Sequence, residues 1–546
     1  MSACFCSFSY ATPIPNAADA SKIKPEEKIT PEDHSQDDQV TTPAPPPAVA
    51  APPGADRIKL VLEHVVIEGA TAFTPEQLAD TYTPYLNKDE TLDIAWVIAG
   101  AITERYRNAG YFLSRAYVPV QHIKDNTLTI KVVEGYIGNV VLDDPAAEHY
   151  AVKSLIADLL NDKPVTSNEV ESFLLRLNDL PGLSFRAVMS PSGVADDQAV
   201  KMTLIPTAKE FRGSVSFDNF GSRFLGPNEV STTLQGSLLP LQQTTLSGLS
   251  STPDKELKYG VIDQNIVLTP DFSLDINGGQ TRAYPGYTLQ SEDIKSLVNS
   301  ASVTLNYQWI RQRQENLTLN GGMYARNFSN DILYTSITRD RIRALFTGFS
   351  YDANDPWKGY DTANFTVTRG IKLLGISEKD DLDLSRQYAL PDFTKGVLNL
   401  SRLQPITDHW SLMAKTSGQI SSGTLYSSEE FGYGGQDFGR AYDTSQITGD
   451  SGLNGSLELR YSGLNTGDFV TFQPFTFYDI GTIWNDSVGQ PPRESGASVG
   501  FGTRFSTSLH QSGIVGVAYP LTRDITIPIY GDKNDYRIFL QLTQEY

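Results

Sequence analysis

The stretch that decides the fold is the last one of the chain, Asp535-Tyr-Arg-Ile-Phe-Leu-Gln-Leu-Thr-Gln-Glu-Tyr546. A period of two places Tyr536, Ile538, Leu540, Leu542 and Tyr546 on one face, and Arg537, Gln541, Thr543 and Glu545 on the other. Membrane barrels combine one lipid-facing and one lumen-facing side in this way, and outer-membrane barrels end on an aromatic residue. A soluble β-sandwich also alternates, so the pattern alone leaves both architectures open.

Strand patterns of this kind fill the chain from Phe211 to Tyr546. They begin near residues 211, 228, 243, 256, 272, 298, 316, 340, 358, 392, 408, 452, 468, 497, 511 and 535. Sixteen such strands leave about 21 residues for each strand with its loop, enough for a tilted membrane strand of about 9 to 11 residues. The sequence therefore predicts an all-β barrel of about sixteen antiparallel strands over residues 209–546.

Composition agrees with a barrel and excludes other classes. Hydrophobic residues make up 40% of the 546 residues, and no apolar run approaches the roughly 18 residues of a membrane helix. The formal charge of −20 argues against a nucleic-acid partner, because phosphate binding needs a basic surface. Cys4 and Cys6 are the only cysteines, which excludes a disulfide framework or a thiolate metal site in the rest of the chain.

The region before the barrel divides into four parts. Residues 1–11 end like a signal peptide but lack its apolar core, so they are either a signal truncated by a misplaced start or an ordinary tail. Residues 12–56 are rich in proline and alanine and predict a disordered linker without a stable plug helix. Residues 57–135 and 136–208 each read strand, helix, helix, strand, strand, which predicts two copies of one α+β module.

Within these modules, we expect helices over residues 75–86 and 92–110 in the first copy, and over 151–161 and 167–179 in the second. Ser167 and Glu171 are placed near the cap of the last helix.

Several motifs carry a resemblance to a known family. They are the stretch AGYFLSRAYVPVQHIKDNTLTIKVVEGYIGNV (Ala109 to Val140), DNFGSRFLGPNEV (Asp218 to Val230), the loop GGQDFGRAYD and the strands GSLELRY, QPFTFYDIGTIW and GASVGFGTRFS. In order and spacing this set resembles the two-partner secretion transporters, the haemolysin and filamentous-haemagglutinin secretion/activation proteins. The resemblance covers residues 57 to 546.

The resemblance implies a function. Residues 57–135 and 136–208 would be periplasmic polypeptide-transport-associated (POTRA) domains, attached to a transmembrane barrel in the bacterial outer membrane. Such a protein recognises a secreted exoprotein by its N-terminal secretion domain and threads it unfolded to the cell surface without ATP, driven by folding outside. Outer-membrane lipid and, during biogenesis, the barrel-assembly machinery would be its other partners.

The resemblance also points to an inward-folded loop at about residues 429–450 carrying Gly439-Arg440-Ala441-Tyr442. Period two places Phe477, Asp479 and Gly481 on the lumen face of one strand, because a carboxylate facing lipid is costly. The same count places Glu458, Arg460 and Arg504 in the lumen, so Arg440 is expected to pair with the acidic residues. The family loop usually reads Val-Arg-Gly-Tyr, and Ala441 takes positive φ less readily than glycine, so the loop tip is expected to differ from that of its relatives.

Three alternatives stay open at this point. A barrel-assembly insertase of the same superfamily shares the architecture, whereas an enzyme or a passive porin belongs to another class. We find no catalytic constellation, and His64, His122, His149 and His510 are scattered without metal-ligand spacing, so neither a cofactor nor a metal is expected. A passive porin would not need the two modules before the barrel.

Overall fold

The computed structural model describes residues 15–22, 50–191, 198–252, 256–466, 469–487, 489–522 and 536–546. The expected signal peptide or tail at residues 1–11 lies outside these residues. The chain forms two compact units, one that contains residues 34–209 and one that contains the remainder of the chain except for residues 311–313. No helix among the described residues is long and apolar enough to cross a membrane.

The first module of residues 57–135 packs a short sheet against one long helix. Its strands are β1 (Lys59–Val61), β2 (His64–Glu68), β3 (Asp89–Thr91), β4 (Arg115–Tyr117) and β5 (Thr127–Val133). Strand β5 lies between β2 and β4, and β1 pairs separately with β3. Helix α2 (Ile94–Asn108) buries the predicted apolar face, with Ile98 and Ile102 completely enclosed.

One predicted helix of this module is much shorter than expected. Helix α1 spans only Pro75–Leu78, and two 3-10 turns, η5 (Ala79–Thr81) and η6 (Thr83–Tyr85), continue the chain. Proline at position 84 lacks an N–H donor and interrupts the α-helical ladder, which explains the early end. The expectation of a helix through residue 86 was therefore wrong.

The second module of residues 136–208 repeats the order of elements. It comprises β6 (Tyr136–Leu142), α3 (Tyr150–Asn161), α4 (Ser167–Asp179), β7 (Leu183–Pro191) and β8 (Ala199–Ala208), with β8 between β6 and β7. Thr166 caps α4 and Glu169 closes the capping box, with Glu169 N–H donating to Thr166 Oγ1 at 3.3 Å. The cap expected at Ser167 and Glu171 is thus formed one and two residues earlier.

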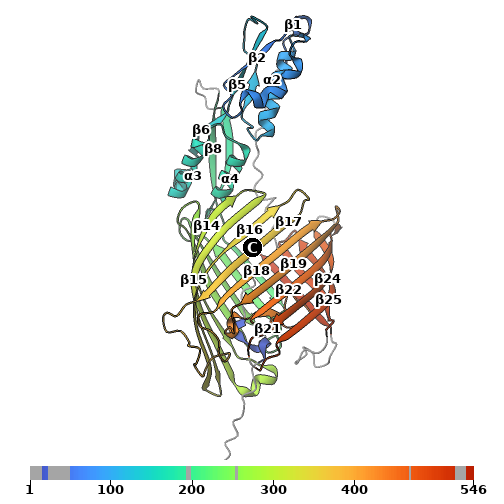
Figure 1. Cartoon of the computed structure of the whole chain (residues 1–546). Helices are drawn as coiled ribbons and strands as arrows, with labels where there is room; N and C mark the ends of the chain where they lie inside the picture. Colours follow the sequence, from blue (N-terminus) through green and yellow to red (C-terminus); the bar gives the residue numbers. More distant parts are fainter. Residues whose placement is uncertain are drawn as a thin grey trace, which may run out of the picture. The chain divides into compact units, whose positions relative to one another are not determined.

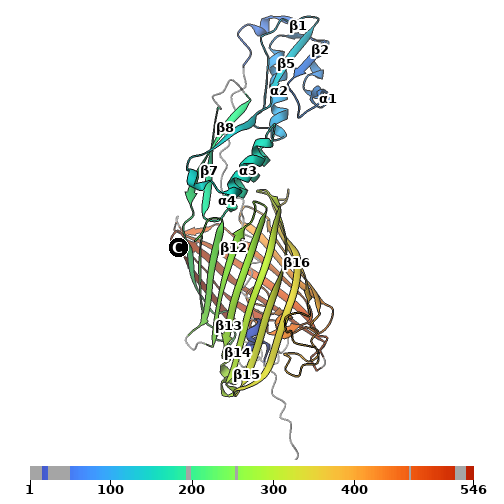
Figure 2. The same cartoon turned by 90° about the vertical axis from the view of Figure 1, so that its left-hand side faces the viewer.

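The remaining unit is a closed barrel of sixteen spanning strands, as predicted (Figures 1 and 2). They are β9 (Arg212–Asp218), β10 (Glu229–Gly236), β11 (Gln242–Ser251), β12 (Leu257–Val267), β13 (Phe272–Ala283), β14 (Ile294–Arg311), β15 (Glu315–Ile332), β16 (Thr335–Asn354), β17 (Tyr360–Gly370), β18 (Thr394–Pro405), β19 (Trp410–Ser421), β22 (Ser451–Tyr461), β24 (Val470–Trp484), β25 (Arg493–Thr507), β26 (Gln511–Pro520) and β27 (Arg537–Glu545). A short strand, β23 (Leu464–Thr466), adds a hairpin to β24.

The last strand closes the barrel against the first. Leu542 lies opposite Phe217, and the C-terminal residue Tyr546 donates its N–H to Gly213 O at 2.8 Å. This pairing leaves the sheet without a free edge, which a barrel in lipid requires because unpaired backbone groups there cost several kcal/mol each. We call the rim at Arg212 and Tyr546 the near rim and the opposite one the far rim.

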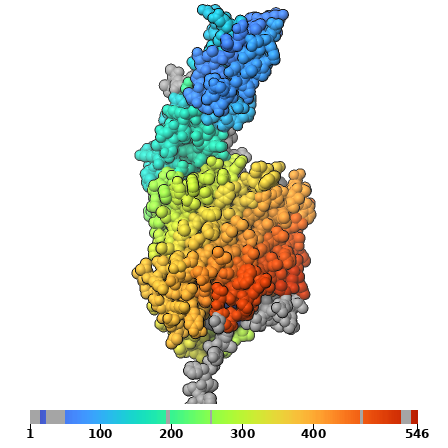
Figure 3. All heavy atoms as spheres, viewed as in Figure 1, coloured from blue at the N-terminus to red at the C-terminus, as the bar shows by residue number. Residues whose placement is uncertain are grey.

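Side chains alternate between lumen and outer surface as period two predicts. On β24, Phe477 and Asp479 are buried, whereas Tyr478 and Ile480 are 41% and 50% exposed on the outside. On β22, Glu458 is buried and Leu457 is 50% exposed. Figure 3 shows that the wall formed by the strands coloured yellow to red is a continuous surface of side chains.

One buried carboxylate holds the first module together. Glu134 follows β5 and accepts hydrogen bonds from the backbone N–H groups of Thr71 at 2.7 Å and Ala72 at 2.9 Å. The hydroxyl of buried Tyr106 donates to it at 2.7 Å. Burial alone raises the pKa of Glu134, but these hydrogen bonds outweigh it and hold the pKa below its usual value.

We predict that Glu134→Leu destabilises this module by about 3 kcal/mol or more, because several buried donors lose their acceptor. Hydrogen exchange of the full-length protein in detergent should show faster exchange at Thr71 and Ala72. Since the folded-state pKa is depressed, the stabilisation by Glu134 is complete above the unfolded pKa of about 4.3 and is lost as the pH falls through the folded value. The exposed Glu104, paired with Arg107 on α2, supplies the control Glu104→Leu, and equal exchange in the two variants would contradict the prediction.

Candidate functional site: a loop anchored inside the barrel

The loop between β19 and β22, residues 422–450, lies inside the barrel. Its strands β20 (Phe431–Tyr433) and β21 (Ile447–Gly449) pair with each other. Apolar residues of the loop and of the lumen wall form one buried cluster, which includes Phe431, Tyr433, Phe438, Tyr442, Phe475, Phe477 and Phe539. The loop is therefore packed against the lumen wall through a shared hydrophobic core.

Arg440 at the loop tip binds Asp479 on β24 through two parallel hydrogen bonds. Its Nε lies 3.0 Å from Asp479 Oδ2, and its Nη2 lies 2.8 Å from Oδ1. The backbone N–H groups of Gly439 and Arg440 donate to the same carboxylate at 3.2 and 3.1 Å. Ser456 Oγ donates to it at 2.7 Å, so this fully buried carboxylate has its oxygens well satisfied.

A second carboxylate, Glu458 on β22, receives three guanidinium groups. Arg440 Nη1 lies 2.6 Å from Glu458 Oε2, while Arg460 Nε and Arg504 Nη2 lie 2.7 and 2.8 Å from Oε1. The structure thus brings together all the charged residues that the sequence placed on the lumen wall. Of these three arginines, Arg440 is the one that contacts both carboxylates.

The charge of Arg440 is stabilised by these partners. Burial by itself lowers the pKa of Arg440, but the hydrogen bonds from its guanidinium to Asp479 and the negative charges of Asp479 and Glu458 raise the pKa above the usual arginine value. The guanidinium also lies over Phe477, with 3.5 Å between Cζ and the ring centroid, and Arg504 lies over Phe475 at 4.3 Å. These cation–π contacts cover the flat faces of the two guanidinium groups, which carry no hydrogen-bond donor.

The loop tip places its left-handed backbone conformation on a glycine. Gly439 adopts positive φ, at 78°, whereas Ala441 is not among the described residues with positive φ. Glycine adopts this conformation without steric cost, so Ala441 does not need positive φ, and the expected difference from relatives of the family stays a prediction. Tyr442 secures the next position, because its hydroxyl donates to Ala497 O at 2.9 Å.

Tyr433 sits in a depression made by two glycines on neighbouring strands. Gly481 on β24 and Gly496 on β25 are direct partners in the sheet. A Cβ atom at Gly481 would lie 2.2 Å from the Tyr433 ring, and one at Gly496 would lie 2.3 Å from it. Gly481 was predicted as a lumen residue, but the contact of Tyr433 with Gly496 was not. This contact depends on the pairing of two strands, which the sequence of either strand alone does not show.

Two further ion-pair clusters, which no local sequence pattern indicates, hold the loop near its start at Glu429 and at its end at Asp450. Glu429 binds Lys395 Nζ at 2.8 Å and Arg326 Nη1 at 2.9 Å. Arg386 forms two hydrogen bonds with Asp450, of 2.5 and 2.9 Å. Burial raises the pKa of Asp450, but Arg386 outweighs this and lowers it below the usual value.

Residues 15–22 also lie in the lumen, near the far rim. Two 3-10 turns, η1 (Asn16–Ala18) and η2 (Ala20–Lys22), bury Ala17, Ala18 and Ala20 against barrel residues (Figure 1, blue, beside β21). Lys22 Nζ lies 2.9 Å from Glu430 Oε2 of the inward loop, and Asp19 accepts a hydrogen bond from Ser427. The predicted disordered linker therefore does not include residues 15–22, which form 3-10 turns. The expectation that no stable plug helix forms falls largely on residues outside the described ones and stays a prediction.

Alanine-rich composition hid this segment from the sequence analysis. Small side chains give no amphipathic pattern, yet they allow the backbone to approach the wall closely. Ser222 Oγ, for example, donates to the carbonyl of Ala17 at 2.5 Å.

The amino-acid sequence matches the models of one family and of its POTRA domain. Residues 199–503 match the family described as haemolysin secretion/activation protein ShlB/FhaC/HecB, and residues 60–135 match the POTRA domain of ShlB type. The outer membrane transporter CdiB of Escherichia coli O6:K15:H31 (strain 536 / UPEC) is 23% identical over 95% of this chain and 90% of its own length. The heme/hemopexin transporter protein HuxB of Haemophilus influenzae (strain 86-028NP) is 24% identical over 82% and 81%.

A solved structure shows the same fold. CdiB from Escherichia coli superimposes with a TM-score of 0.71 at 18% identity, covering 94% of each chain.

We predict that Gly496→Ala weakens the loop anchor by displacing the Tyr433 ring, at a cost of about 1–3 kcal/mol in the free energy of unfolding. In a Tyr433→Ala background the same substitution should cost less than about 0.5 kcal/mol, because the clash is gone. Urea unfolding of the four proteins in detergent measures both values. Gly455→Ala is the control, since a Cβ atom there meets nothing closer than 3.7 Å, and equal costs of Gly496→Ala in both backgrounds would refute the depression.

Proposed function

We propose that this chain exports one exoprotein, unfolded, through the barrel lumen. The chain belongs to the haemolysin secretion/activation protein ShlB/FhaC/HecB family. It is an outer-membrane transporter for secreted partner proteins, with its POTRA domains in the periplasm. The observation that carries this proposal is that two separate segments, the loop of residues 422–450 and residues 15–22, pack against the wall inside the lumen. Segments of this kind are removable, whereas a packed barrel interior is not.

The lumen wall itself is suited to an extended polypeptide. Polar side chains of β12, β13 and β14 form hydrogen-bonded ladders across the wall, for example Asn265 to Asp275 at 2.6 Å and Asn306 to Asp275 at 2.5 Å. The polar side chains of this wall can form hydrogen bonds with the backbone of the exported polypeptide, as water does. They do not form a deep apolar pocket that would retain the polypeptide.

The two inward segments differ in how firmly they are held. Arg440 makes hydrogen bonds to two fully enclosed carboxylates, while the contact of residues 15–22 with the loop relies on Lys22 and Asp19. A lysine is a single flexible point charge, and a bidentate arginine pair is stronger. We therefore assign residues 15–22 the role of the first segment to leave, with the loop as the more permanent brace.

Recognition is assigned to the POTRA domains. In the second domain β7 is a nine-residue edge strand, and Val188 on it is 43% exposed. Edge strands bind extended segments by adding a strand to the sheet. The N-terminal secretion domain of the partner would bind in this way before threading.

Threading is proposed to proceed without ATP, with the free energy supplied by folding of the exoprotein outside the cell. A barrel-assembly insertase is the alternative within the superfamily. The family match and the relatives, which are transporters, favour export.

Deletion of residues 57–135 tests the recognition role. We expect a barrel that still inserts in the outer membrane, shown by the usual shift of the unheated band in gel electrophoresis, but that secretes none of the exoprotein encoded beside it. If secretion persists at the wild-type level, the first POTRA domain does not recognise the partner. If secretion fails but an unrelated barrel protein also disappears from the membrane, the insertase alternative gains support.

Lys22→Ala tests the order of release. Loss of the ion pair with Glu430 should raise the open-channel fraction in planar bilayers several-fold, because residues 15–22 lose their main charged contact with the loop. Lys415→Ala is the matched control, since Lys415 is another lumen lysine that binds a loop carboxylate, Asp437, at 2.7 Å. Equal conductance of Lys22→Ala and the wild type would contradict the assigned role.

A further inference from the structure

Among the described residues, outward-facing basic side chains at the far rim of the barrel cluster on one side. Strands β12 to β17 are consecutive neighbours in the sheet, and several of them appear side by side in Figure 2. Their outward-facing positions near the far rim include six bases, which we call the basic patch: Lys258, Arg282, Arg339, Arg341, Arg343 and Arg369.

The outward direction of these residues follows from the alternation on each strand. On β16, Ile342 and Ala344 are buried in the lumen, so Arg341 and Arg343 point outward. On β12 and β13, Lys258 and Arg282 are direct partners, next to buried Leu257 and Ala283. The patch is thus on the lipid side of the wall and has no contact with the lumen.

The depth of the three arginines on β16 coincides with the outer edge of the membrane. Tyr351 lies on the same outer face, close to the near rim, and its hydroxyl donates to Glu315. A tyrosine in this position marks the periplasmic boundary of the apolar band. With about 3.3 Å of rise per residue and a tilt of about 40°, Arg343, Arg341 and Arg339 lie about 20, 25 and 30 Å above it along the barrel axis. The apolar band of such a barrel is about 25 Å tall, so Arg343 lies about 5 Å inside its outer boundary, Arg341 lies at the boundary and Arg339 lies about 5 Å beyond it.

The β16 arginines are not neutralised within the protein. Arg343 Nη1 donates to Asn327 Oδ1 at 2.9 Å, and Arg339 Nε donates to Ser336 Oγ at 3.0 Å. Arg369 of the basic patch lies 4.0 Å from Asp392, whereas no ion pair among the described residues includes Arg339, Arg341 or Arg343. By contrast, an outward pair at the near rim is complete, with Arg402 2.6 Å from both Asp355 and Asp361.

The other side of the far rim has a different surface. Outward-facing residues there are apolar or aromatic, such as Ile420, Leu453, Ile480 and Tyr519. Arg493 faces outward as well, but it lies over the ring of Trp484, with 5.9 Å from Cζ to the ring centroid. The charge asymmetry therefore belongs to β12–β17 and is not a general feature of the rim.

We propose that the basic patch binds the phosphate groups of lipopolysaccharide in the outer leaflet. Because the chain enters the barrel from periplasmic POTRA domains at the near rim, the far rim faces the cell exterior. Lipopolysaccharide places phosphates at the outer edge of the apolar band, and arginine binds phosphate bidentately. Alternate residues on a strand are about 7 Å apart, so neighbouring arginines on β16 reach different phosphate oxygens or two phosphates.

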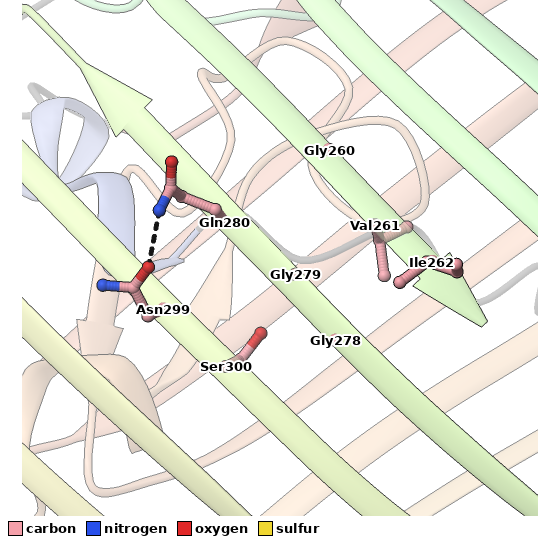
Figure 4. A pocket seen from close by; sticks show the side chains of 8 residues that line it. All are labelled: Gly260, Val261, Ile262, Gly278, Gly279, Gln280, Asn299 and Ser300. Atoms are coloured by element: carbon pink, nitrogen blue, oxygen red, sulfur yellow. Dashed lines mark hydrogen bonds between the residues drawn. The ribbon is translucent and has the colours of Figure 1, made fainter. Parts of the chain in front are cut away.

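A shallow hollow beside the patch extends the fit to the lipid part. Gly260 and Gly278 face outward there, and a Cβ atom at Gly260 would meet nothing within 4 Å. The hollow lies one outward position below Lys258 and Arg282, and Gln280 and Asn299 are joined by a 2.7 Å hydrogen bond at its edge (Figure 4). An acyl chain lying here would place its phosphorylated head beside the two bases.

The test uses the full-length protein in nanodiscs, with lipid A carrying two phosphates and dephosphorylated lipid A as probes in native mass spectrometry. We expect the wild type to bind the phosphorylated form at least ten-fold more tightly, with a difference that shrinks as salt rises. The variant R339Q/R341Q/R343Q should lose most of this discrimination, R339K/R341K/R343K should retain much of it, and R493Q should behave as the wild type.

Two results would overturn the proposal. One is a wild type that binds both lipids equally, which needs no variant and is independent of folding defects. The other is a glutamine triple variant that keeps the discrimination of the wild type. In the second case, the glutamine variant is also tested for capture of an acidic exoprotein segment. If it has lost that capture while its lipid binding is that of the wild type, the patch binds the secreted partner instead.

Discussion

Burial of charge in the lumen is the constraint on which the inward loop depends. Arg440 is 5% exposed and Asp479 is completely buried. Each group would be costly alone, since removing one partner of a buried pair typically costs about 3–5 kcal/mol. The loop therefore cannot leave the lumen gradually, because the two hydrogen bonds to Asp479 and the one to Glu458 break together.

A buried ion pair is weak evidence for stability but good evidence for a defined position. Replacing such a pair by apolar residues is often neutral or favourable, so its value here is in fixing where the loop tip lies. The Tyr433 ring against Gly481 and Gly496 adds a steric restraint of the same kind. Together these contacts define one position for the loop tip, whereas the contact of residues 15–22 with the loop relies on Lys22 and Asp19, and the proposed order of release rests on this difference.

The sequence predicted the elements whose signal is periodic. Sixteen strands and the inward positions of Glu458 and Asp479 follow from a side-chain period of two, because a one-residue slip would turn the charges toward lipid. The family resemblance supplied the loop, and the geometry then brought Arg440 to both carboxylates.

The missed features depend on contacts between distant segments. Arg386 meets Asp450 from a different loop, and Lys22 meets Glu430 from more than four hundred positions away, so neither pair leaves a local pattern. Helix α1 is short because its continuation contains Pro84, a local signal that the predicted helix overran. Residues 15–22 escaped notice because alanines pack well without an amphipathic face.

A double-mutant cycle on Arg440→Gln and Asp479→Asn tests the central claim most directly. The free energies of unfolding in detergent of the wild type, the two single variants and the double variant give the coupling between the two residues. A buried, bidentate pair that fixes the loop predicts a coupling of about 2 kcal/mol or more. A coupling below about 0.5 kcal/mol would show that the loop is held in the lumen by other contacts and would contradict this account.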